Sequence, residues 1–142
     1  MASFFNDTPV SPERTTMTQQ DALNWFEIPA TDLDRAQRFY EALLDIQMSR
    51  EEAGPQALAV FKYAEGRVGG ALVAGPRVSA PSTDGSVVYL DARPTLEDTL
   101  ARAERLGARL LVPTVKLPGD LGSFAHIADS EGNRVGLHSK TA

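Results

Sequence analysis

Two segments of the chain carry apolar residues at intervals of three and four positions, and each follows a short alternating run. The apolar positions are Leu33, Ala36, Phe39, Tyr40, Leu43 and Leu44 in the first segment, and Leu96, Leu100, Ala103 and Leu106 in the second. This spacing gathers the apolar side chains on one face of an α-helix. We therefore predict helices over residues 33–44 and 96–106.

Each predicted helix has a start signal and the second also has a stop signal. Thr31 and Thr95 each provide a hydroxyl that can accept from a free helix N–H, and Asp34 and Asp98 place an acid in the first turn. Gly107 is typical of the residue that follows a helix C-terminus. Thr31 and Thr95 are the predicted N-caps.

Short apolar runs separated by turn residues follow both helices. Glu65-Gly66 and Glu131-Gly132 mark the same turn in each half. The runs are residues 57–62 and 68–74 in the first half and 124–128 and 134–138 in the second. The repeat of strand, capped helix and further strands predicts an α+β fold built from two similar units, with a site where the halves meet.

Composition limits the class of protein. The length of 142 residues and the apolar content of 42% suit one compact domain. The net charge of −5 and the lack of a basic cluster argue against nucleic acid as a partner. The absence of cysteine excludes disulfides and thiolate ligands.

No apolar run approaches the roughly 20 residues of a membrane span, and there is no signal-peptide core, so we predict no membrane partner and a cytoplasmic protein. Residues 1–21 lack any period and are predicted to be a flexible tail before a single domain over 22–142.

Two segments carry a resemblance to a known family. The segment 24–36 with Phe39-Tyr40, and the closing segment 124–137, resemble the vicinal oxygen chelate superfamily, which includes glyoxalase I, extradiol dioxygenases, fosfomycin-resistance transferases and bleomycin-resistance proteins. The similarity covers about residues 22–139. It implies two βαβββ modules, about 22–75 and 86–139, whose sheets form a cup-shaped, partly open mixed barrel with the helices outside, often within a dimer.

In the metalloenzymes of this superfamily, His and Glu residues from four strands hold a divalent metal in the cup. The corresponding positions here fall on Trp25, on Gly70 or a residue next to it, on Val87 or Val88, and on Gly136. None of these side chains is a metal ligand, because divalent metals of this class take imidazole and carboxylate donors. We therefore predict no metal and no other cofactor.

Strand alternation nevertheless predicts a polar site. Phe26 and Ile28 share one strand face and so do Val88 and Leu90, which leaves the opposite face for polar side chains. That concave face collects Glu27, Tyr89, Arg134 and His138. We predict Glu27, His138 and Tyr89 as catalytic candidates and Trp25, Arg134, Gly136 and His126 as ligand-binding candidates.

Each candidate also has a structural alternative. Glu27 is either a site residue or a partner of Arg134 in a salt bridge, since an acid between apolar residues needs a partner. Trp25 either stacks on a ligand or fills space opposite Gly70 and Gly136. His126 is either a site residue or a hydrogen-bonded structural histidine of its strand. His138 is either a site residue or an exposed residue near the chain end, and Tyr89 is either a site residue or an ordinary sheet residue.

Three functions remain open for such a chain. The preferred one is a small-molecule-binding protein of the superfamily. The second is a lyase- or isomerase-like enzyme that uses Glu27 as a base, with a pKa raised by burial. The third is a metal-dependent glyoxalase- or dioxygenase-like enzyme with a displaced site, in which Glu27 and His138 supply two donors. Exposed strand edges favour a homodimer.

Overall fold

The structure is a computed structural model, and it describes residues 21–141 of the chain. The predicted tail therefore lies, except for Asp21, outside the described residues. Two modules of the same order follow one another. The first consists of β1 (Trp25–Pro29), α2 (Leu33–Leu44), β2 (Ser49–Ala53), β3 (Gln56–Val60) and β4 (Gly69–Ala74), and the second of β5 (Tyr89–Asp91), α3 (Leu96–Arg105), β6 (Arg109–Lys116), β7 (Ser123–Ala128) and β8 (Arg134–Ser139).

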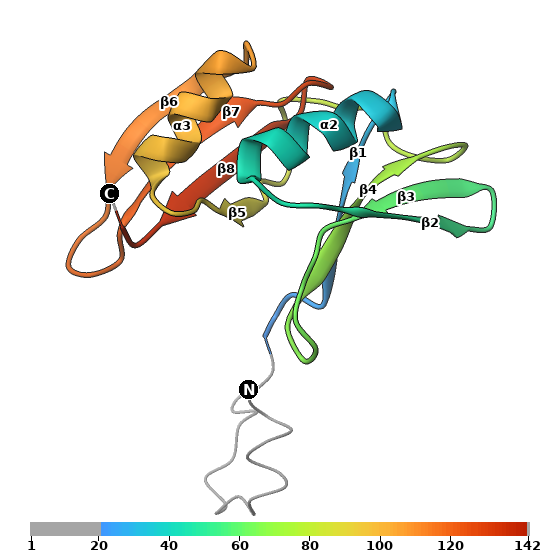
Figure 1. Cartoon of the computed structure of the whole chain (residues 1–142), viewed down its shortest axis with the longest axis horizontal. Coiled ribbons are helices and arrows are strands. Elements are labelled where there is room, and N and C mark those ends of the chain that lie inside the picture. Colours follow the sequence, from blue (N-terminus) through green and yellow to red (C-terminus); the bar gives the residue numbers. More distant parts are fainter. Residues whose placement is uncertain (1–20, 142) are drawn as a thin grey trace, which may run out of the picture.

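Each module forms its own four-stranded mixed sheet. Sheet A has the order β1-β4-β3-β2 and sheet B the order β5-β8-β7-β6, with the first and last strand of each module parallel and the other neighbours antiparallel. The two helices contact each other, and each also packs on its own sheet. In Figure 1, α3 overlies sheet B, α2 runs along the top of sheet A, and the two sheets do not close into one barrel. The α+β fold of two βαβββ modules is thus confirmed.

The two predicted helices are present, and one predicted cap is wrong. The Oγ1 of Thr95 accepts from the backbone N–H of Asp98 at 3.0 Å, as expected. At α2, however, the N-cap is Asp32, whose carboxylate accepts from the backbone N–H of Arg35 at 3.0 Å. The helix begins at Leu33, so the residue in the extended cap conformation is Asp32, one position later than the predicted Thr31.

Two strands, β2 and β6, were not predicted from the sequence. β2 has the sequence SREEA and is exposed along its whole length, and β6 is exposed over much of its length. Both are the outer strands of their sheets. β2 has no apolar alternation to detect because it has no buried face, whereas β6 contains a short apolar run, Leu110–Val112, that Pro113 interrupts. The sequence analysis therefore indicated only two of the three strands after each helix.

The core lies between the helices and the helix-facing side of the sheets. Tyr40 and Leu43 of α2 are completely buried, and the Tyr40 ring packs edge-on against Phe39 and Phe61 at centroid distances of 5.2 and 5.5 Å. Leu72 of β4 and Leu137 of β8 occupy equivalent positions in the two sheets and are also fully buried. The helix-facing side of the sheets is therefore largely committed to packing.

The turn between β7 and β8 is joined to the start of α2 in the other module. The carboxylate of Glu131 accepts from the backbone N–H groups of Thr31 and Asp32, both at 2.9 Å, and from the guanidinium of Arg35 at 2.8 and 3.0 Å. Its side chain is fully buried. Burial alone would raise the pKa of Glu131, but these hydrogen bonds, with a further one from Ser130, outweigh it and hold the pKa at about 2.

Asp129 and Asn133 extend this junction inward. Asp129 accepts from the hydroxyl of Tyr40 at 2.6 Å and from the backbone N–H of Asn133 at 2.8 Å. The side-chain amide of Asn133 donates to the carbonyl of Pro29 at the end of β1, at 2.8 Å. The second module is thus fastened to both the first strand and the helix of the first module.

Candidate functional site

The open face of sheet A presents an aromatic pair beside an acid. The indole N–H of Trp25 donates to the Oε2 of Glu27 at 3.3 Å, and the Trp25 ring lies edge-on to Tyr63 with centroids 6.0 Å apart. All three residues are exposed, Trp25 to 37% and Tyr63 to 49%. Glu27 is therefore exposed, and the side-chain hydrogen bond that it forms within residues 21–141 is the long one from Trp25.

The glycines of the sheets are covered by rings other than Trp25. A Cβ at Gly69 would overlap the ring of Tyr63, one at Gly70 that of Phe26, and one at Gly136 that of Tyr89. Trp25 pairs in register with Gly69. The interpretation of Trp25 as the ring that fills the space at Gly70 and Gly136 was therefore wrong, because its ring contacts Tyr63 instead.

The open face of sheet B brings four of the predicted residues together. Tyr89 of β5 and His126 of β7 both pair with Gly136 of β8, from opposite sides. Since Gly136 has no side chain, the Tyr89 ring reaches across it, and its hydroxyl lies 2.7 Å from the Nε2 of His126. The Nδ1 of His126 is 3.1 Å from a terminal nitrogen of Arg134. Arg134, His126 and Tyr89 thus form one hydrogen-bonded row over Gly136.

Contacts around this row hold Arg134 and Tyr89 in place. The Nε of Arg134 donates to the carbonyl of Thr83 at 3.0 Å, which holds the guanidinium in place. Phe124 adds a ring beside Tyr89, edge-on with centroids 5.6 Å apart. Burial lowers the pKa of His126, and the positive charge of Arg134 lowers it further, so this imidazole is neutral near pH 7.

The three catalytic candidates do not contact one another. Glu27 lies on sheet A, whereas Tyr89 and His138 lie on sheet B. The Nε2 of His138 is 2.7 Å from the backbone carbonyl of Leu121, to which it donates, since a carbonyl only accepts. Tyr89 is bonded to His126 as described. Their joint catalytic role stays a prediction.

Glu27 and Arg134 line a common small cavity of about 290 Å³ without forming an ion pair. The ion pairs among residues 21–141 are Arg35–Glu131, Arg50–Asp34 and Arg93–Asp91. The salt-bridge alternative for Glu27 is therefore wrong for this conformation, because Arg134 is directed to Thr83 and His126.

A larger cavity of about 700 Å³ lies between sheet A and β5. Its lining is mainly apolar and aromatic, and a few charged residues stand at its edge. The aromatic residues in this lining are Phe26, Phe61, Tyr63 and Tyr89. Pockets that bind small organic molecules have this composition, with a mostly apolar wall and few polar groups.

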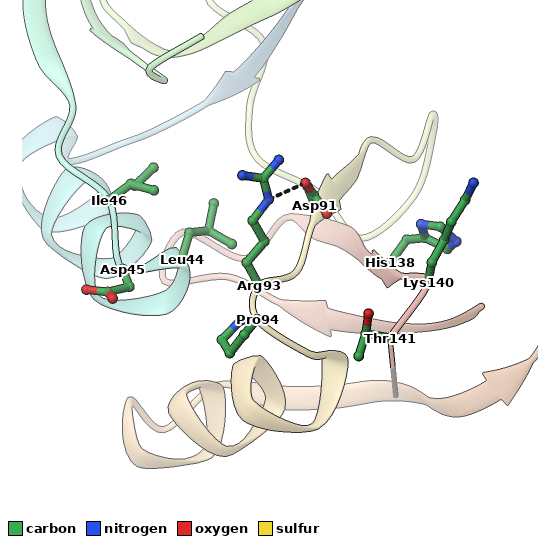
Figure 2. A pocket seen from close by; sticks show the side chains of 9 residues that line it. All are labelled: Leu44, Asp45, Ile46, Asp91, Arg93, Pro94, His138, Lys140 and Thr141. Atoms are coloured by element: carbon green, nitrogen blue, oxygen red, sulfur yellow. Dashed lines mark hydrogen bonds and ion pairs between the residues drawn. The ribbon is translucent and has the colours of Figure 1, made fainter. Parts of the chain in front are cut away.

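A second large depression, of about 820 Å³, adjoins the first at the ends of α2 and β5. Figure 2 shows Arg93 bonded to Asp91, with Leu44 and Ile46 on one side of this pair and His138 on the other. The Arg93 Nε donates to the Asp91 Oδ2 at 2.6 Å. Because Arg93 and Asp91 line both cavities, this exposed ion pair stands between them. The second depression contains no aromatic ring except the imidazole of His138, so it is the less suited of the two to a flat ligand.

The residues at the expected metal positions do not fit a metal. Trp25, Gly70, Val87 and Gly136 offer no donor side chain, and no group of three or more His, Cys, Asp or Glu capable of holding a metal occurs within residues 21–141. In the same part of the chain, no helix is long and apolar enough to cross a membrane.

Comparison with known proteins agrees with this architecture. The family model of the Glyoxalase/Bleomycin resistance protein/Dioxygenase superfamily matches residues 22–137. The chain belongs to this superfamily. No curated protein sequence matches it.

Solved structures share its fold at low sequence identity. A glyoxylase/bleomycin resistance protein/dioxygenase domain from Frankia sp. EAN1pec superposes with a TM-score of 0.64 at 18% identity, covering 85% of this chain and 93% of that one. TnmS3, an antibiotic binding protein from Streptomyces sp. CB03234, gives 0.61 at 18% identity and coverages of 85% and 97%. The fosfomycin resistance protein FosX from Mesorhizobium loti gives 0.52 at 18% identity and coverages of 85% and 93%. The superfamily resemblance inferred from the sequence is thus confirmed, and at this identity these structures show the fold alone.

Sequence reasoning missed several residues of the candidate site. Phe61 and Tyr63 follow β3 in an irregular segment. Outside a strand, the alternation of side chains does not predict which face of the sheet a residue covers. Phe124 was included in a strand but not assigned to a face. Asp91 and Arg93 were not singled out, because the position of their ion pair between two cavities depends on the arrangement of the modules.

Proposed function

We propose that this protein binds a small, largely apolar and planar molecule in the cavity of about 700 Å³ between sheet A and β5. The observation that carries the proposal is the aromatic lining of that cavity. Phe61 and Tyr63 come from the segment that follows β3 of sheet A, and Tyr89 comes from β5 of sheet B. Rings from both modules therefore contact one space, which suits a flat ligand.

The relatives support this proposal without deciding it. The superfamily includes small-molecule-binding proteins, and one neighbour of similar fold is described as an antibiotic binding protein. We further propose that binding here needs no metal, since Trp25 and Gly136 replace ligands at the expected positions. Elemental analysis of protein prepared without a histidine tag checks this part, and one transition metal per chain contradicts it.

The binding proposal is tested with a panel of planar aromatic compounds that includes nitrobenzene. The single tryptophan, Trp25, contacts Tyr63 at the cavity wall, so its fluorescence reports on occupancy. We expect at least one compound to bind, and Tyr63→Ala to weaken that binding by about tenfold when measured by calorimetry, as expected for loss of a ring contact.

A matched control uses an exposed apolar residue far from the cavity. Leu110 on β6 is 52% exposed and does not line the cavity, so Leu110→Ala should leave the affinity unchanged. If no compound of the panel alters Trp25 fluorescence or the melting temperature, the proposal is contradicted. Equal losses in both variants would place the ligand elsewhere.

The assembly proposed for this chain is a homodimer in the cytoplasm. The outer strands β2 and β6 expose unpaired edges, and β6 exposes Leu110 and Val115. Such edges are common sites of association between copies of a chain. Light scattering at micromolar concentration should give twice the mass of one chain, and the mass of a single chain would contradict the dimer.

A further inference from the structure

The contacts of Arg134 and Tyr89 with the two ring nitrogens of His126 determine which of these nitrogens carries the proton. A guanidinium carries only donors and does not lose its proton in proteins. Because Arg134 lies 3.1 Å from the Nδ1 of His126, that nitrogen must be the unprotonated acceptor. A neutral imidazole then carries its proton on Nε2.

The Nε2–H of His126 faces the hydroxyl oxygen of Tyr89 at 2.7 Å. This N–H therefore donates, and the Tyr89 oxygen accepts. The hydroxyl proton of Tyr89 cannot point back toward the imidazole, because a proton already occupies that line. It is left free to donate to another group, on a side chain that is 49% exposed.

The position of the hydroxyl is fixed by the sheet. Tyr89 can cross from β5 to β7 because the residue between them is Gly136, where any Cβ would overlap the ring. Arg134 is itself held by the Thr83 carbonyl. The hydroxyl is thus a pre-oriented donor, with the cation of Arg134 two hydrogen bonds away and the Phe124 ring alongside.

We propose that the open face of sheet B contains a binding site for the oxygen of a ligand. The Tyr89 hydroxyl donates a hydrogen bond to this oxygen, which is an anionic or carbonyl oxygen carried by a planar ring. His126 and Arg134 are positioning residues that act through Tyr89. The proposal rests on the proposed binding function and adds the chemistry of its ligand, an aryl oxyanion or a conjugated carbonyl compound. An ionised acceptor is favoured because a hydrogen bond to a charged group is about twice as strong as a neutral one.

The proton assignment is tested without any ligand. Two-dimensional ¹⁵N–¹H correlation of the histidine side chains distinguishes the two neutral tautomers. We expect His126 to carry its proton on Nε2 at neutral pH, and Arg134→Met to allow the other tautomer to appear. Observation of the Nδ1–H tautomer or of an imidazolium in the wild-type protein would overturn the inference.

The ligand chemistry is tested with two probes of the same shape, 4-nitrophenolate and nitrobenzene, at a pH where the phenol is ionised. Tyr89→Phe removes the hydroxyl and keeps the ring over Gly136. We expect the affinity for 4-nitrophenolate to fall by about tenfold or more, and that for nitrobenzene to stay within about twofold. Tyr63→Phe, which removes the hydroxyl of the other tyrosine that lines the cavity, should leave the ratio of the two affinities unchanged.

The possible failures are distinguishable. If wild-type protein binds nitrobenzene but Tyr89→Phe binds 4-nitrophenolate as tightly as wild type, the inference is overturned and the binding function stands. If Tyr89→Phe weakens both probes equally, the ring and not the hydroxyl is responsible, and the inference is again overturned. If neither probe nor any compound of the aromatic panel binds, both proposals fall.

Discussion

The β7–β8 turn and the loop between β3 and β4 contain the same Glu-Gly pair but serve different ends. In the turn, residues 129–133 read DSEGN, and in the loop, residues 63–67 read YAEGR. Glu131 is buried against the start of α2, whereas Glu65 is exposed and makes no side-chain hydrogen bond within residues 21–141. The Glu-Gly pair therefore marks a turn that joins the two modules in one place and an exposed loop in the other.

The flanking residues explain the difference. Asp129 and Asn133 supply the carboxylate and amide that reach Tyr40 and Pro29. Tyr63 and Arg67 stand at the corresponding positions of the loop and cannot replace them. Tyr63 instead contacts Trp25 and lines the aromatic cavity of about 700 Å³. One module thus uses its turn to join the two halves, and the other uses the equivalent loop to form the wall of a candidate ligand site.

The largest expected effect comes from Asp129→Ala. This change leaves the completely buried hydroxyl of Tyr40 and the backbone N–H groups of Glu131 and Asn133 without their acceptor, while the side-chain amide of Asn133 keeps the Pro29 carbonyl. Buried groups that lose a partner cost about 1–3 kcal/mol each, so we expect the free energy of unfolding to fall by about 3–5 kcal/mol in urea titrations. The control Tyr63→Ala, at the corresponding loop position, should cost about 1 kcal/mol or less. A loss below about 1 kcal/mol for Asp129→Ala would show that the junction is not what holds the modules together.

The second prediction compares the two glutamates directly. Glu131→Ala removes the acceptor of two backbone N–H groups at the start of α2 and the partner of Arg35. We expect a loss of about 2 kcal/mol, in the range of a helix cap plus a partly exposed ion pair. Glu65→Ala should change stability by no more than about 0.5 kcal/mol. Equal effects of the two substitutions would refute the contrast drawn between turn and loop.

The third prediction concerns the pH at which the Glu131 contribution disappears. The pKa of Glu131 is lowered from 4.5 to about 2 in the folded protein. A carboxyl with a lowered folded-state pKa stabilises the fold fully above its unfolded-state value, and this contribution is lost as the pH falls from about 4.5 toward about 2. The stability difference between wild type and Glu131→Gln should therefore be constant near neutrality and shrink across that interval. A difference that stays constant down to pH 2 would contradict the assignment.

The fold was largely predictable because its signals are local. The helical spacing from Leu33 to Leu44, the cap at Thr95 and the turn at Gly132 each depend on residues a few positions apart. The outer strand β2 gave no signal because it has no buried face, and the apolar run of β6 is short and interrupted by Pro113. The cap at α2 was misplaced by one residue because Thr31 and Asp32 are both good N-caps, and the choice between them depends on where the helix begins.

The site was predictable only in part, for a different reason. Strand alternation placed Tyr89, Arg134 and Gly136 on one face, as the register of sheet B shows. It could not show that His126 lies across Gly136 from Tyr89, because that contact depends on the antiparallel register of β7. It also joined Glu27 to this group, although β1 belongs to the other sheet. The role of Asp129 as an acceptor for Tyr40 joins residues 89 positions apart and has no local signature.

The smallest expected effect distinguishes the starts of the two helices. At α3, the hydroxyl of Thr95 caps the N–H of Asp98, so Thr95→Ala should lower the free energy of unfolding by about 1 kcal/mol. At α2, the cap is Asp32 and Glu131 binds the backbone N–H of Thr31, an interaction that does not use the Thr31 side chain. Thr31→Ala should therefore change stability by less than about 0.5 kcal/mol, and both variants can be measured in the same urea titrations. If Thr31→Ala cost as much as Thr95→Ala, the threonine hydroxyl would be acting at both helices, and the start of α2 would depend less on the β7–β8 turn than its hydrogen bonds indicate.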